Sequence, residues 1–162
     1  MNTESLVSMG VASGCHRWSW RHLYVLVPVL IENLDFFEED LVAREDEIGG
    51  PAALVVMVRP GITMPNAAVR REIADQLCLH HQRISCAATL ILRRGFFAST
   101  FLSVGSQVMR DSGAKPQQRL YTDVDKAAKW VADTTREHGV PADQIGETLS
   151  EVEGRMAVGC TS

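Results

Sequence analysis

Two continuous apolar runs constrain the fold more than any other feature of this sequence. They are Ala52–Val58 (AALVVMV) and residues 85–92 (SCAATLIL). Neither run alternates polar with apolar side chains, so each predicts a strand buried on both faces, as in a parallel sheet. Between them, residues 66–81 are typical of an amphipathic helix, with Asn66 as its N-cap. A strand, a crossover helix and a second buried strand indicate an α/β fold.

The rest of the chain continues this alternation. A strand is expected over residues 22–29, where Pro28 indicates an edge position or the end of the strand. A short additional strand is expected over residues 14–20, with Trp18 and Trp20 on one face. The remaining predicted elements are helices over 30–48, 96–111 and 122–138, a short strand over 119–121, and a final helix with Ile145, Leu149, Val152 and Met156 on one stripe. This order predicts a mostly parallel sheet covered by helices.

Composition excludes several classes of protein. The chain has 162 residues, 46% hydrophobic and 22% charged, which favours one folded domain over disorder. Its net charge of -4 disfavours a strongly cationic nucleic-acid binder, so no nucleic-acid partner is expected. No apolar run is long enough for a membrane span, and the start lacks the pattern of a secretory signal, so a cytoplasmic location is expected. The four cysteines form no disulfide framework, and Cys78 and Cys86 are predicted to be core residues.

The charges are unevenly distributed along the chain. Residues 32–47 contain eight acidic side chains and one basic side chain, whereas residues 59–119 contain nine basic and three acidic ones. Such asymmetry fits a binding face, or two solvated surfaces of opposite sign. Surfaces of opposite charge could also pair in a homodimer.

The loops after the buried strands are the places to search for a site, because parallel sheets bind ligands beyond the carboxyl ends of their strands. Arg59, Arg93 and Arg94 follow two of these strands, so an anion or an acidic partner is conceivable there. Neither loop contains a glycine-rich phosphate motif, and no serine lies in a G-x-S-x-G turn. The histidines at 80 and 81 diverge by about 100° on a helix. We therefore expect no catalytic residues, no metal site and no cofactor, and hence no enzyme.

Six short segments resemble a known family: RPG at 59–61, PN at 65–66, VRREI at 69–73, the strand at 87–92, GF at 95–96, and LYTD with KAAKWV within 120–131. Together they are similar to small bacterial STAS-like proteins, which are relatives of the anti-sigma-factor antagonists, over residues 18–133. The resemblance implies a four- to five-stranded, mostly parallel sheet with helices mainly on one face, plus a C-terminal amphipathic helix. It divides the chain into a flexible extension (1–17), a STAS-like α/β domain (18–139) and a C-terminal helix and tail (140–162).

The resemblance also implies a regulatory role through a protein partner. In antagonist members a phosphorylatable serine opens the helix after a central strand, but Asn66 stands there in this chain, and only Thr63 in the preceding loop carries a hydroxyl group. The predicted residues for binding a partner or an anion are Arg59, Thr63, Asn66, Arg70, Arg93 and Arg94. The alternative is a carrier of a small ligand or lipid, in which Phe36, Phe37 and the apolar helix 96–109 line a cavity.

Overall fold

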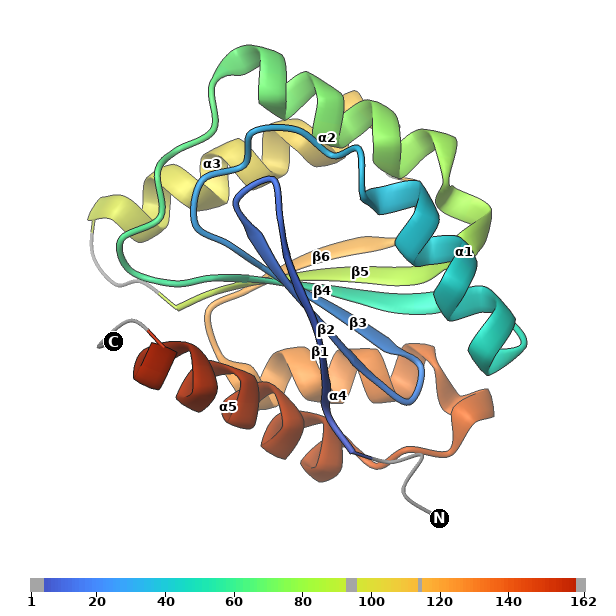
Figure 1. The fold of residues 1–162 in the computed structure, drawn as a ribbon. Coiled ribbons are helices and arrows are strands. Elements are labelled where there is room, and N and C mark those ends of the chain that lie inside the picture. Colours follow the sequence, from blue (N-terminus) through green and yellow to red (C-terminus); the bar gives the residue numbers. More distant parts are fainter. Residues whose placement is uncertain (1–4, 93–95, 114, 160–162) are drawn as a thin grey trace.

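A single six-stranded mixed sheet runs through the molecule in the computed structural model, which describes residues 5–92, 96–113 and 115–159 (Figure 1). The strands lie side by side in chain order, and the first three are antiparallel, whereas β3 to β6 are parallel. Their bounds are β1 Val7–Ala12, β2 Cys15–Trp20, β3 Leu23–Pro28, β4 Ala52–Val58, β5 Ile84–Ile91 and β6 Gln118–Tyr121. The predicted α/β class is confirmed, with six strands where four or five were expected.

Helices cover both faces of this sheet. One face carries α1 (Phe37–Ile48), α2 (Ala67–Leu79) and α3 (Phe96–Asp111), and the other carries α4 (Val124–Thr134) and α5 (Ala142–Gly159), as Figure 1 shows. Short 3₁₀ turns follow α2 and α4. The expectation of helices mainly on one face is therefore wrong. The physical reason is that every residue of β3 is buried, so both of its faces need a cover.

The core beneath α4 and α5 is formed by alternate residues of the strands, those that point toward this face of the sheet. Leu23, Val25 and Val27 of β3 point into it, together with Trp18 and Trp20 of β2. The α5 stripe (Ile145, Leu149, Val152 and Met156) packs into the same core, with each residue at most 4% exposed. The predicted face of β2 and the predicted stripe of the last helix are both confirmed.

The N-terminal part forms a hairpin, which differs from the flexible extension predicted for residues 1–17. Residues 7–12 pair with β2 around a turn in which Ser13 and Gly14 have positive φ angles. A Cβ atom on Gly14 would lie 1.6 Å from the carbonyl oxygen of Leu30, so only glycine fits there. That approach lets the Gly14 carbonyl accept hydrogen bonds from the backbone N–H groups of Val29 and Leu30.

The first helix was predicted over residues 30–48, but these hydrogen bonds involve its first residues, and α1 begins only at Phe37. The Asn66 cap of α2 is confirmed, since its Oδ1 accepts a hydrogen bond from the Val69 N–H at 2.9 Å. Asp123 caps α4, since its Oδ1 accepts a hydrogen bond from the Lys126 N–H at 3.0 Å. Within the described part of the chain, no helix has the length and hydropathy needed to cross a bilayer.

Candidate functional site

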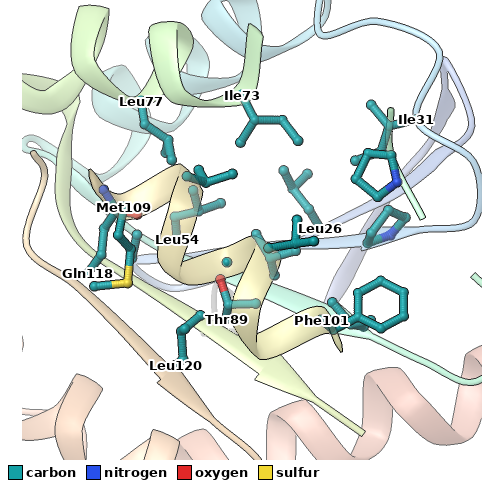
Figure 2. A pocket seen from close by; sticks show the side chains of 18 of the residues that line it. Leu26, Ile31, Leu54, Ile73, Leu77, Thr89, Phe101, Met109, Gln118 and Leu120 are labelled. Carbon is teal, nitrogen blue, oxygen red and sulfur yellow. The ribbon is translucent and has the colours of Figure 1, made fainter. Parts of the chain in front are cut away.

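A cavity of about 140 Å³ lies between the sheet and the pair of helices α2 and α3 (Figure 2). Its floor consists of side chains from neighbouring strands in register. Leu26, Val56, Thr89 and Leu120 form one row across β3 to β6, and Leu54, Ala87 and Gln118 form the next. The floor therefore spans the whole parallel half of the sheet.

The roof of the cavity comes from α2 and α3. The lining residues of these helices are Ile73, Gln76, Leu77, Phe101, Val104, Gly105, Val108 and Met109. At Gly105 a Cβ atom would lie 2.8 Å from a methyl group of Leu120, so glycine lets α3 approach β6 closely. The carrier alternative expected lining residues from this helix and from Phe37, and these do line the cavity, whereas Phe36 is buried in the adjoining core.

Two central strands, β4 and β5, contain residues that are only partly buried because they line the cavity. Val56 is the one residue of β4 that is not fully buried, and in β5 only Ser85 and Thr89 share that property. Val56 and Thr89 are register partners at the centre of the floor. Their partial exposure is to the cavity that they line.

The lining is almost entirely uncharged. Arg119 is the one charged residue among the described lining residues, and strand alternation directs its side chain away from the face that carries Leu120 and Gln118. Burial raises the pKa of the Cys15 thiol to about 12, so this lining residue is a neutral thiol at pH 7. A ligand in this space would meet apolar groups and a few neutral polar ones.

Four of the residues predicted to bind a partner or an anion are described, all of them follow the carboxyl end of β4, and some have local structural roles. Asn66 caps α2, and the guanidinium of Arg70 donates a hydrogen bond to the carbonyl of Pro65 at 2.7 Å. Thr63 is exposed, and its N–H donates to the Val29 carbonyl at 3.2 Å. Arg59 is half-buried directly after β4. Arg93 and Arg94 lie outside the described residues.

A buried ionic cluster was not expected from the sequence. The Arg17 guanidinium donates to both carboxylate oxygens of Asp40, at 2.6 and 2.8 Å, and the Tyr24 hydroxyl donates to the same carboxylate at 2.5 Å. Burial, and then the bond to Asp40, raise the pKa of Tyr24 above its ordinary value. The cluster ties α1 to β2 and β3. A signal was present, because Asp40 and Arg44 share the helical spacing of the buried Phe37 and Leu41.

Other acidic residues of α1 are also neutralised within the chain. Arg44 pairs with Glu47 at 2.7 Å, and Arg83 pairs with Glu45 at 3.2 Å. The acidic segment is thus less open to outside partners than its composition indicates.

A second buried polar group, His22, connects the turn before β3 to the end of α4. His22 lies 2.9 Å through Nε2 from the Thr135 hydroxyl, which itself donates to the Val131 carbonyl at 2.7 Å. The hydroxyl therefore accepts from His22, whose ring stacks on His138 with centroids 4.2 Å apart. Burial, followed by the His138 charge, lowers the pKa of His22 to about 4, so its ring is neutral at pH 7.

The cysteine and histidine residues near the end of α2 form no ligand set. Cys78 is exposed, which corrects the expectation that it is a core residue, whereas Cys86 is buried as predicted. In the described ranges, no group of three or more histidine, cysteine or acidic side chains is arranged to hold a metal ion. Comparison with known proteins gives no relative, since no protein-family model, curated protein or solved structure matches the chain.

Proposed function

We propose that this protein binds a small, neutral, largely apolar molecule in the cavity beneath α2 and α3. The observation that carries the proposal is an apolar space of about 140 Å³ in the parallel half of the sheet. An engineered apolar cavity of about 150 Å³ remains dry and binds benzene, so a ligand of roughly one ring is the right size.

The apolar lining supports this proposal. A bound apolar molecule would leave water and gain dispersion contacts with the side chains that line the cavity. A charged ligand would lose its hydration without gaining a counter-charge, so a neutral one is favoured.

The lining favours a protein that binds its ligand without converting it. The Cys15 thiol is the one nucleophile of its kind among the described lining residues, and its raised pKa removes the reactive thiolate. Toluene is therefore a suitable first probe, because it tests binding without requiring any reaction.

The test is isothermal titration of the purified protein with toluene, compared with the variant Val104→Phe. The larger ring would fill the cavity from the α3 side, so we expect toluene to bind the natural chain and not this variant. Ser103→Phe is the matched control, since Ser103 is exposed on the same helix, and it should bind toluene normally. Equal toluene binding to both variants, or no binding of either toluene or its hydroxylated relative p-cresol to the natural chain, would refute the proposal.

A second candidate is a regulatory domain of the STAS-like kind that contacts a second copy of this chain. It is supported by Val29 and Leu30, which are each 48% exposed and lie in the loop whose backbone is hydrogen-bonded to Thr63. Exposed acidic groups of α1, such as Glu38, could face exposed basic groups such as Arg71 across that contact.

Light scattering at increasing protein concentration tests the second candidate. We expect a dimer that Leu30→Asp abolishes, while Leu79→Asp, at an even more exposed leucine on α2, leaves it intact. A monomer at every concentration would exclude this candidate and leave the ligand-binding proposal untouched.

A further inference from the structure

We infer that the ligand of this cavity carries one hydrogen-bonding group, best a hydroxyl, and that Thr89 is the residue that recognises it. The inference rests on the proposed function and specifies the chemistry of its ligand. It follows from the one polar side chain that the sheet places in the middle of the cavity floor.

Thr89 lies at the centre of an otherwise apolar row. Its register partners are Val56 on β4 and Leu120 on β6, and Leu26 completes the row on β3. Figure 2 shows the Thr89 oxygen directed from the sheet toward the space beneath α3. A ligand that occupies the cavity would therefore rest directly on this hydroxyl.

Among the described residues, no protein group is hydrogen-bonded to the Thr89 hydroxyl, whereas two nearby polar side chains on β6 and α3 have partners within the chain. The Gln118 amide donates to Ser112 at 2.8 Å, and the Ser106 hydroxyl of α3 donates to the Leu102 carbonyl at 2.9 Å. A valine would have nearly the same shape as Thr89 without an oxygen to satisfy. The Thr89 hydroxyl is reachable from the cavity, so a ligand with a hydrogen-bonding group at this position would be favoured over one that covers the hydroxyl with an apolar group.

Size and polarity together define a chemical class. About 140 Å³ accommodates a single ring, and one hydroxyl at the floor matches one hydroxyl or similar group on that ring. The absence of a charged side chain aimed inward among the described lining residues excludes a carboxylate or ammonium group from the favoured ligands. A neutral monocyclic phenol is the simplest member of this class.

The experiment compares p-cresol with toluene, which differ by one hydroxyl, in the natural chain and in Thr89→Val. A net neutral hydrogen bond changes affinity by roughly 3- to 10-fold, so Thr89→Val should weaken p-cresol binding by that factor. Toluene binding should stay the same or become tighter. Circular dichroism and a denaturation curve verify that the variant is folded.

Two further variants locate the effect. Thr89→Ser keeps the hydroxyl and should retain the p-cresol affinity that Thr89→Val loses. Gln76→Leu removes a polar group from the roof and should affect p-cresol and toluene equally. The inference is overturned if Thr89→Val changes the affinities for p-cresol and toluene by the same factor. It is also overturned if only Gln76→Leu removes the preference for p-cresol over toluene. If neither compound binds the natural chain, the proposed function itself fails, and the inference fails with it.

Discussion

Acid should weaken this fold through His22, and the size of the effect follows from the pKa of that residue. His22 is 1% exposed, and its pKa is lowered to about 4, whereas an unfolded histidine has a pKa of about 6.5. Between these values the unfolded chain binds a proton that the folded chain excludes. Stability is therefore fully present above pH 6.5 and falls as the pH drops toward 4.

The linkage relation gives the magnitude. Between pH 7.5 and pH 5, proton uptake by His22 in the unfolded chain lowers the free energy of unfolding by about 2 kcal/mol, and by about 3 kcal/mol at pH 4. The nearby charges do not reverse the sign. His138 and Arg21 lower the pKa, Glu137 raises it, and burial dominates all three.

Urea denaturation at pH 7.5 and pH 5 measures the effect, with His22→Gln as the comparison. Glutamine can still donate a hydrogen bond toward Thr135 but does not titrate, so the natural chain should lose about 2 kcal/mol more than the variant. A titration of the His22 ring by NMR is independent of the stability of the variant. Equal losses in the two proteins, or a ring that titrates near pH 6.5, would refute the reasoning.

Three other substitutions test the packing described above by urea denaturation. Asp40→Ala leaves the partly buried Arg17 charge without its carboxylate and should lower the free energy of unfolding by about 2 kcal/mol. Gly14→Ala places a Cβ atom 1.6 Å from the Leu30 oxygen, and the hairpin should be lost from the sheet, with a destabilisation above about 2 kcal/mol. Asn66→Ala removes the cap of α2 and should destabilise the fold by about 1 kcal/mol.

The first two of these substitutions each have a matched control in the chain. Asp46→Ala removes an exposed carboxylate from the same helix as Asp40 and should change stability by less than about 0.5 kcal/mol. Gly49 also has a positive φ, but nothing lies within 4 Å of the position that a Cβ atom would take there. Gly49→Ala should therefore destabilise the fold less than Gly14→Ala. Equal effects within either pair would show that burial and the backbone clash are not the causes.

The sequence predicts those parts of the fold whose signals are local. Continuous apolar runs predict β4 and β5, Asn66 predicts the start of α2, and the stripe from Ile145 to Met156 predicts the buried face of α5. The strand β1 has no such signal, since it lies at the edge of the sheet with Val7 and Val11 exposed. Its short, interrupted pattern is also that of a loop.

The candidate site depends on contacts between distant segments, which a single sequence does not encode in a readable form. Arg17 meets Asp40 across 23 residues, and His22 meets Thr135 across 113. The cavity is built mainly from ordinary core residues, so its volume depends on how far α2 and α3 stand from the sheet. The one local sequence feature that pointed to a cavity was Thr89, a polar residue within an apolar run.

The most direct test of ligand binding is a methyl NMR titration of the natural chain with p-cresol. The account predicts shifts at the methyl groups of Val56, Ile73 and Val104, which line the cavity, and none at Val25 or Leu149 beneath α4 and α5. Shifts on the α4 and α5 face, or no shift at any methyl group at saturating p-cresol, would contradict it.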